Sequence, residues 1–152
     1  MSTSRSITVI NGPNLSLLGS RETEHYGSTT LDELVDLGFR KSPEMPMTNS
    51  AVPSDIEGEL VRAINSASGS SFGVIINPAA YSHYSIAIMD AMKAFDGPVV
   101  EVHISRVFSR ESFRNDFVTA KAADAFVAGA GIRGYLHAMD ILCELNEKDL
   151  EV

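Results

Sequence analysis

Short apolar runs rich in valine and isoleucine alternate with segments of helical spacing along the 152-residue chain. Runs that are apolar at nearly every position are typical of strands buried on both faces of a parallel sheet. Strands that alternate with helices in this way predict an α/β domain with helices on both faces of the sheet. The expected strands cover residues 6–11, 47–52, 72–77, 99–104 and 123–128.

The five expected strands favour a flavodoxin-like three-layer sandwich, with a five-stranded parallel sheet of order 2-1-3-4-5. Right-handed crossover connections restrict the possible orders. Pro53 places the second strand at an edge, because proline cannot donate a hydrogen bond to a neighbouring strand. The length suits one domain, which we expect to span residues 1–152.

Helix starts are marked by pairs of polar residues three positions apart. Thr30 with Glu33, and Ser54 with Glu57, match the capping-box pattern, in which each side chain bonds the other residue's backbone N–H. Pro43 must end the first of these helices. Further helices are expected over residues 82–96, 110–115 and 135–145.

Charge and cysteine content exclude several classes of partner. The formal net charge of −8 argues against binding to nucleic acid, which requires a basic face. A small anion can still be held by a few arginines. Cys143 is the only cysteine, so no intrachain disulfide can form and a cytoplasmic location is expected. No apolar run approaches the about 20 residues of a membrane-spanning helix, so no membrane partner is expected.

Two glycine motifs match known sites but stand in the wrong context. Residues 129–134 match the dinucleotide fingerprint G-x-G-x-x-G. That site needs a further strand with an acidic residue about 20 positions on, and no such strand follows before Val152. Residues 69–73 match G-x-S-x-G, which must follow a strand and open a helix, whereas here it follows a helix. We therefore expect tight turns at both places, and no dinucleotide or other cofactor.

Polar and titratable side chains concentrate just after the expected strands. Ligands of open α/β sheets bind at this carboxyl edge. Taken singly, Arg21 and Arg114 would be surface arginines and Tyr26 a packing residue, but their joint placement favours a binding site. The set comprises Asn11, Asn14, Arg21, Tyr26, Asn77, Tyr81, His83, Glu101, His103, Ser105 and Arg114.

The residue types in this set indicate acid–base chemistry. No cysteine or serine has a convincing base for acyl transfer, and no set of metal ligands is present. His103, a residue type that titrates near neutral pH, shares one side of its strand with Glu101. A tyrosine beside arginines can form a phenolate, because positive charge lowers its pKa. A phenolate base and an imidazolium acid fit proton abstraction next to a carbonyl and loss of water, with an asparagine steadying the enolate.

Several segments carry a resemblance to a known family. They read Asn-Gly-Pro-Asn-Leu, Leu-Gly-Ser-Arg-Glu and Tyr-Gly within residues 11–27, Ile-Asn-Pro-Ala-Ala-Tyr-Ser-His over 76–83, and Glu-Val-His-Ile-Ser over 101–105. With Phe113-Arg114 and residues 129–135, this pattern resembles the type II 3-dehydroquinate dehydratases. The resemblance implies a cofactor-free lyase that reversibly dehydrates 3-dehydroquinate to 3-dehydroshikimate through an enolate, in the shikimate pathway or quinate catabolism. It also implies a small anionic ring substrate and a dodecamer built of trimers.

The resemblance further implies roles for most residues of the set. Tyr26 would be the base and His103 the acid, oriented by Glu101. Arg21 would lower the pKa of the tyrosine and stabilise the transition state, and Asn14 would hold a water that supports the enolate. Substrate contacts would come from Asn77, His83, the backbone of Ile104, Ser105, Arg114 and, from a neighbouring subunit, Asp90.

The chain also departs from the usual pattern of that family. Arg106 and Phe108 stand where asparagine and histidine are usual, and Met89 replaces a common arginine. Residues 116–118, Asp-Phe-Val, replace a His-Ser-Tyr-like run. Three alternatives stay open: a divergent paralogue that dehydrates a related hydroxy-keto ring acid, a non-catalytic binding module on the same fold, and a dinucleotide-dependent oxidoreductase.

Overall fold

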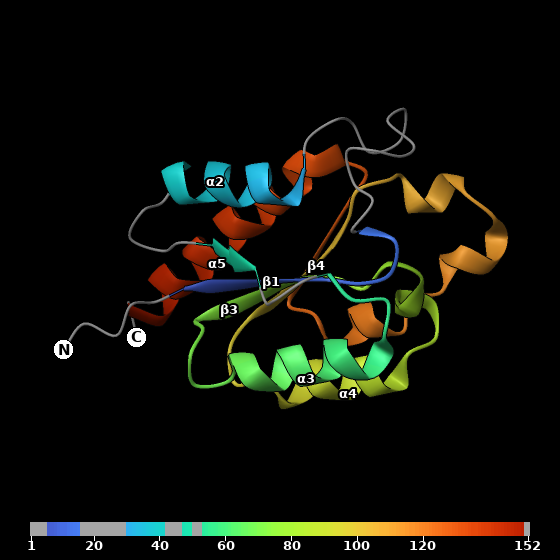
Figure 1. Ribbon diagram of the computed structural model, residues 1–152, viewed down its shortest axis with the longest axis horizontal. Coiled ribbons are helices and arrows are strands. Elements are labelled where there is room, and N and C mark those ends of the chain that lie inside the picture. The colour runs from blue at the N-terminus through green and yellow to red at the C-terminus, as the bar shows by residue number, and fades with distance from the viewer. Residues whose placement is uncertain (1–5, 16–29, 42–46, 50–52, 151–152) are drawn as a thin grey trace.

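The computed structural model describes residues 6–15, 30–41, 47–49 and 53–150. In these residues five parallel strands form one sheet, in the order β2-β1-β3-β4-β5 (Figure 1). The predicted α/β class with a parallel sheet is therefore confirmed, and β2 lies at the edge that Pro53 favours. The strands are β1 (Ile7–Asn11), β2 (Met47–Asn49), β3 (Gly73–Asn77), β4 (Val99–His103) and β5 (Ala125–Ala128).

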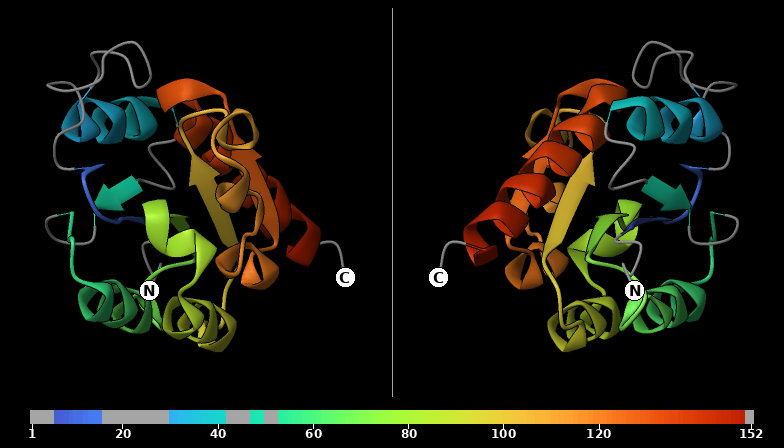
Figure 2. Two further views of the ribbon diagram at one scale, coloured as in Figure 1. Left: turned by 90° about the vertical axis from the view of Figure 1, so that its right-hand side faces the viewer. Right: turned by 90° about the vertical axis from the view of Figure 1, so that its left-hand side faces the viewer.

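Helices cover both faces of this sheet. Helices α2 (Leu31–Lys41) and α5 (Gly134–Leu150) lie on one face, and α3 (Glu57–Ala67) and α4 (Ile86–Ala94) lie on the other (Figures 1 and 2). None of the helices in the described ranges combines the length and the apolar character needed to cross a membrane. Short 3₁₀ helices connect the larger elements: η2 (Ala79–His83), η3 (Val107–Ser109), η4 (Ser112–Asn115), η5 (Thr119–Ala122) and η6 (Gly131–Arg133).

The strands supply two hydrophobic cores, because successive side chains point to opposite faces of a sheet. Ile7 and Val9 of β1 belong to the core beneath α2 and α5. Ile10 belongs to the core beneath α3 and α4. Every residue of β1, β3 and β4 is buried, as their apolar runs predict. Full burial of one such aliphatic side chain contributes about 1.5–3 kcal/mol to folding.

The strand register gathers polar side chains at the carboxyl edge of the sheet. Asn11 at the end of β1 pairs with Asn77 at the end of β3. Glu101 of β4 pairs with Ile76 of β3, and His103 ends β4 two residues later. Residues that are far apart in sequence therefore emerge side by side, which is where an open α/β sheet binds its ligands.

One of the two predicted capping boxes is present and the other is wrong. The Glu33 carboxylate accepts from the Thr30 N–H at 2.8 Å, and the Thr30 hydroxyl accepts from the Glu33 N–H at 3.2 Å. The second helix begins instead with Ile56 in the N-cap position and without a side-chain cap. The Ser54 hydroxyl accepts from the Ile56 N–H at 3.0 Å, so it closes a turn before the helix rather than capping it.

The predicted helix from residue 82 onward also begins later. Residues 79–83 form η2, and α4 begins at Ile86 after Ser85, whose hydroxyl accepts from the Ile88 N–H at 3.0 Å. A true N-cap serine therefore lies three residues beyond the predicted start. The segment expected over 110–115 forms η4 after η3, and β5 begins at residue 125 rather than 123. Helix α5 continues to Leu150, five residues past its predicted end.

Candidate active site

The ends of β1 and β3 are joined by a buried tyrosine. The Tyr135 hydroxyl donates to Asn11 Oδ1 at 2.5 Å and accepts from Asn77 Nδ2 at 3.1 Å. Asn77 Oδ1 in turn accepts from the Ala79 N–H at 3.0 Å. All three polar side chains are almost completely buried, so each hydrogen bond replaces one that water would otherwise make. The two asparagines were expected at this edge from the sequence, whereas Tyr135, which lies 124 residues from Asn11, was not.

The loops after β1 and β3 approach each other closely. The Gly12 N–H donates to the Asn77 carbonyl at 2.8 Å, and a Cβ at Gly12 would lie 2.8 Å from the Pro78 carbonyl oxygen. Only glycine permits this approach. Asn14 follows with a left-handed φ of 67°, and its N–H donates to the Asp55 carboxylate at 2.9 Å. Asn14 is exposed at this edge, on the loop where the resemblance places a water-holding residue.

A second buried network lies at the end of β4. Glu101 Oε1 accepts from His103 Nε2 at 2.7 Å, and Oε2 accepts from the Thr119 hydroxyl at 2.7 Å. Glu101 and Thr119 are fully buried and His103 is 5% exposed. A carboxylate this deeply buried is costly unless both oxygens have partners, and here both do. The predicted pairing of Glu101 with His103 is present, and Thr119 is a partner that no local sequence pattern indicated.

Phe117 connects the two histidines of the site. Its ring centroid lies 4.9 Å from that of His83 and 5.4 Å from that of His103. The ring centroids of Phe126 and His103 lie 5.4 Å apart. His83 Nδ1 lies 2.8 Å from the Asp116 carbonyl oxygen. A carbonyl only accepts, so Nδ1 of His83 carries a proton and donates it.

Arg114 occupies η4, beyond the end of β4. Its Nε donates to the Glu111 carboxylate at 2.8 Å, and its guanidinium carbon lies 5.3 Å from the centre of the Phe113 ring. The pKa of Glu111 is lowered, first by a hydrogen bond from its own backbone N–H and then by the Arg114 side chain. Within the described ranges no recorded hydrogen bond joins Arg114 to the buried networks.

Ile104 and Ser105 directly follow β4 at the same edge. The Ile104 carbonyl accepts from the Gly131 N–H at 3.1 Å, and the Ser105 carbonyl accepts from the Val107 N–H at 2.9 Å. Asp90 lies on α4 and is exposed. Arg21 and Tyr26 lie outside the described residues, so their predicted places stay predictions.

The glycines of residues 129–134 serve turns and packing, as the sequence predicts. Gly129 has a φ of 81°, and a Cβ there would lie 2.9 Å from Arg106 Cγ. A Cβ on Gly134 would lie 3.3 Å from Val102 Cγ1, so α5 starts close against the sheet. The absence of a side chain at Gly129 therefore allows the aliphatic part of the Arg106 side chain to lie across the end of β5.

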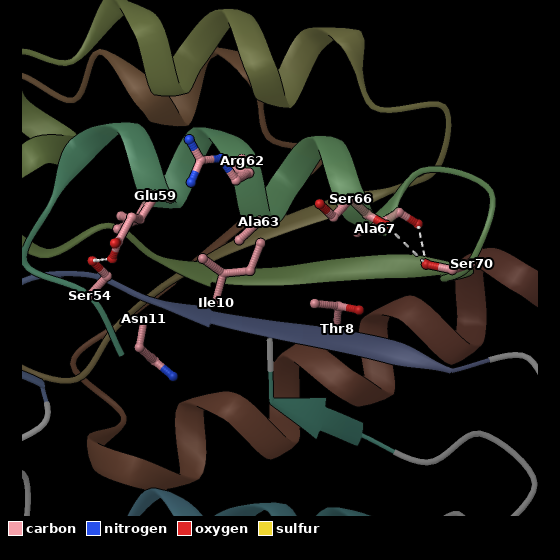
Figure 3. A pocket seen from close by; sticks show the side chains of 11 residues that line it. Thr8, Ile10, Asn11, Ser54, Glu59, Arg62, Ala63, Ser66, Ala67 and Ser70 are labelled. Atoms are coloured by element: carbon pink, nitrogen blue, oxygen red, sulfur yellow. Dashed lines mark hydrogen bonds between the residues drawn. The ribbon is translucent and has the colours of Figure 1, made fainter. Parts of the chain in front are cut away.

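A groove of about 490 Å³ opens between β1 and α3, and its lining includes Asn11, whose side chain belongs to the first network. Figure 3 shows that Thr8 and Ile10 of β1 point toward α3, whereas the side chain of Asn11 points to the opposite face. The Ser70 hydroxyl in this groove donates to backbone carbonyls of α3. The described residues that line the groove include no histidine and no tyrosine, so His103 lies outside this lining.

The arrangement is suited to proton transfer. His103 has one ring nitrogen bonded to Glu101, which leaves its other nitrogen to exchange a proton with a ligand. The described part of the chain holds no group of three or more histidine, cysteine or acidic residues that could bind a metal. Hydrogen-bonding amides at the ends of β1 and β3 can bind hydroxyl or carboxylate groups of a polar ligand.

Comparison with known proteins places these features in one family. Residues 5–143 match the family model described as dehydroquinase class II. The chain is 43% identical to a 3-dehydroquinate dehydratase of Corynebacterium glutamicum over 141 residues, which cover 93% of this chain and 97% of the relative. It is 46% identical to a 3-dehydroquinate dehydratase of Bartonella henselae over 136 residues, 90% of this chain and 92% of the relative.

Solved structures agree with the sequence comparisons. A type II dehydroquinase from Butyrivibrio crossotus superposes with a TM-score of 0.83 at 39% identity, over 91% of this chain and 97% of that chain. A 3-dehydroquinate dehydratase-like protein from Bifidobacterium longum superposes with a TM-score of 0.65 at 29% identity, over 94% and 98% of the two chains. With the match of the family model to nearly its whole length, this chain belongs to the class II dehydroquinase family.

Proposed function

We propose that this protein is a hydro-lyase that reversibly dehydrates 3-dehydroquinate to 3-dehydroshikimate, with residues 1–152 forming one catalytic domain. The observation that carries this proposal is the buried chain from Thr119 through Glu101 to His103. It holds one imidazole in a fixed orientation at the edge where an α/β sheet binds its ligand. The names of the curated relatives identify the substrate.

The reaction needs one base and one acid. Tyr26, as a phenolate near Arg21, would take a proton from the carbon next to the substrate's ketone, which leaves an enolate. The C–O bond to the departing hydroxyl then breaks, and a proton from His103 joins that hydroxyl to form water. Because Nε2 of His103 is bonded to Glu101, the proton comes from the other ring nitrogen. Asn14 would hold a water against the enolate oxygen, and no metal or organic cofactor is proposed.

The substrate's hydroxyls and carboxylate would be held around this pair. Nδ2 of Asn77 and Nδ1 of His83 are each engaged in a hydrogen bond within the protein. These bonds fix the direction of the second Nδ2 hydrogen of Asn77 and of the Nε2 atom of His83. The backbone of Ile104, Ser105 and the Arg114 guanidinium would bind from the loop after β4. Asp90 would complete the site of a neighbouring subunit.

Replacing Arg114 by alanine is expected to raise the KM for 3-dehydroquinate at least tenfold and to leave kcat within a factor of about three. A hydrogen bond to a charged group contributes about 1.5–3 kcal/mol, which corresponds to about ten- to hundredfold in binding. Steady-state kinetics measures both constants. Arg110→Ala is the matched control, because Arg110 is also close to Glu111 but at 4.0 Å. An unchanged KM in Arg114→Ala would remove this residue from the binding site.

The proposed function is tested directly by incubating the purified protein with 3-dehydroquinate in the presence of a chelator. The product has a conjugated double bond, so its formation is followed as a rise in ultraviolet absorbance. A steady rise at a rate proportional to enzyme concentration supports the proposal. A folded protein that produces no rise contradicts it, and related hydroxy-keto ring acids would then be the substrates to examine.

We also propose that the protein self-associates as trimers that assemble into a dodecamer. Three large apolar side chains near the first turns of α3 and α4 are exposed: Ile56 at 60%, Tyr84 at 62% and Ile86 at 62%. They lie close together, because Ser85 donates to Glu57 across the same two helix starts at 2.5 Å. Asp90 is on this side of α4, as a residue serving a neighbouring site should be. Sedimentation velocity should show a trimer or a multiple of it, and a monomer would contradict this proposal.

The composition of the chain supports two proposals, one about its partners and one about its location. A net charge of −8 supports the proposal that it does not bind nucleic acid. A single cysteine supports a cytoplasmic location, where thiols stay reduced. The dehydration step is the same in the shikimate pathway and in quinate catabolism, and we propose the reaction for either.

A further inference from the structure

Tyr135 is a buried titratable residue that the proposed mechanism does not use. It lies in the first turn of α5 and is fully buried. Burial raises the pKa of Tyr135 far above that of a free tyrosine, and the hydrogen bond from Asn77 only partly offsets this. The raised pKa favours the protonated hydroxyl at neutral pH.

The single proton of Tyr135 gives its hydrogen bonds a direction. The hydroxyl accepts from Asn77 Nδ2, so its own proton goes to Asn11 Oδ1. The Asn77 amide cannot turn over, because Oδ1 is already needed as the acceptor for the Ala79 N–H. A turned amide would place the Nδ2 hydrogens against that N–H, and two donors would face each other.

The backbone conformation of Ala79, just after β3, depends on the orientation of the Asn77 amide. Its φ of 51° lies in the left-handed region, which is unfavourable for a residue with a Cβ. The bond from the Ala79 N–H to Asn77 Oδ1 closes a turn that holds this conformation. The orientation of the Asn77 amide and the shape of the loop that carries His83 are thus linked.

We propose that Tyr135 is a positioning residue that orients the Asn11 amide and holds the Asn77 amide in the orientation that Ala79 requires, so that the second Nδ2 hydrogen of Asn77 is presented to the substrate. The proposal rests on the assignment of Asn77 to substrate binding in the proposed function. Tyr135 touches neither reacting atoms nor substrate and acts through the two asparagines.

The test uses Tyr135→Phe, which removes one oxygen and keeps the ring. KM for 3-dehydroquinate is expected to rise about fivefold to tenfold, the usual effect of one misplaced hydrogen bond, with kcat changed less than about threefold. Leu142→Val is the matched control. Leu142 is also fully buried on α5 in the same core, but it makes no contact with either asparagine that the structure records. Thermal unfolding of both variants shows whether their losses of stability are comparable.

A double mutant separates positioning from a general loosening of the core. If Tyr135 acts through Asn77, the KM of Tyr135→Phe combined with Asn77→Ala should equal that of Asn77→Ala alone. Full additivity of the two effects would overturn the proposal. A rise in KM in Leu142→Val equal to that in Tyr135→Phe would also overturn it, since the effect would then follow from stability alone.

Hydrogen–deuterium exchange gives a second test that does not depend on turnover. In Tyr135→Phe the peptide containing Ala79 should exchange faster than in Leu142→Val at matched stability, because the bond to Asn77 Oδ1 is loosened. Equal exchange in the two variants would overturn the positioning role. If the wild-type protein fails to dehydrate 3-dehydroquinate, the proposed function falls, and the exchange result alone decides the role of Tyr135.

Discussion

Replacing His103 by glutamine is expected to lower kcat for 3-dehydroquinate by about two to four orders of magnitude, the usual contribution of a positioned acid or base. KM should change much less, because the substrate contacts proposed for Asn77 and Arg114 are kept. Glutamine is chosen because its amide can still donate to Glu101, which would otherwise lose its partner at 2.7 Å. Steady-state kinetics with the ultraviolet assay measures both constants.

A comparison with His103→Ala separates chemistry from stability. Alanine leaves the fully buried Glu101 with only the Thr119 hydroxyl. Loss of one partner of a buried pair destabilises a fold by about 3–5 kcal/mol, so this variant should melt well below the glutamine variant while both lose turnover. His137→Gln, on the exposed face of α5, should retain full activity. Turnover above a tenth of wild type in His103→Gln would show that another residue is the acid.

The core of the fold follows from local patterns in the sequence. Three strands are buried along their whole length because their residues are apolar at nearly every position, and that is visible without any contact information. Among the errors are two helix starts. Ser54 matches a capping pattern but closes a turn, and the helix expected from residue 82 begins after Ser85, which is the N-cap of α4. Several serines within a few residues can serve as caps, and only packing against the sheet decides which one does.

The part of the candidate site that depends on local strand geometry could be predicted from the sequence. Glu101 and His103 are two positions apart on one strand, so their contact is a local consequence of strand geometry. Thr119 lies 18 residues from Glu101, and Tyr135 lies 58 residues from Asn77. Nothing in the neighbourhood of either residue marks its partner, because these bonds depend on how separate elements pack.

Phe117 is a further residue whose contacts could not be predicted from the local sequence. In the sequence Phe117 stands out only as part of a departure from the pattern of the family. In the structure its ring lies against both His83 and His103, with Phe126 beside it. An aromatic ring at this point excludes water from the side of His103 that faces it, which strengthens the hydrogen bond to Glu101. The departure therefore affects the environment of the proposed acid.

Replacing Tyr26 by phenylalanine should likewise remove about two to four orders of magnitude from kcat while leaving KM within a small factor. The chain has four tyrosines, and the structure describes the other three. The Tyr81 hydroxyl donates to the Asp55 carbonyl at 2.7 Å. Desolvation, with smaller effects of Tyr81 and Glu57, raises the pKa of Tyr84, and burial raises that of Tyr135. The raised pKa values of Tyr84 and Tyr135, and the hydrogen bond that engages the Tyr81 hydroxyl, support Tyr26 as the proposed base.

The matched control for this variant is Tyr84→Phe. Tyr84 is 62% exposed near the same edge of the sheet, and loss of its hydroxyl should leave kcat unchanged. Tyr26→Phe should still bind substrate, because phenylalanine keeps the ring and removes only the proton acceptor. Substrate affinity at equilibrium, measured by calorimetry, should therefore match the wild-type KM within a few fold. If Tyr26→Phe keeps its turnover and Tyr84→Phe loses it, the base is Tyr84, and the raised pKa of that residue would have to be reversed by a neighbouring subunit or by the substrate itself.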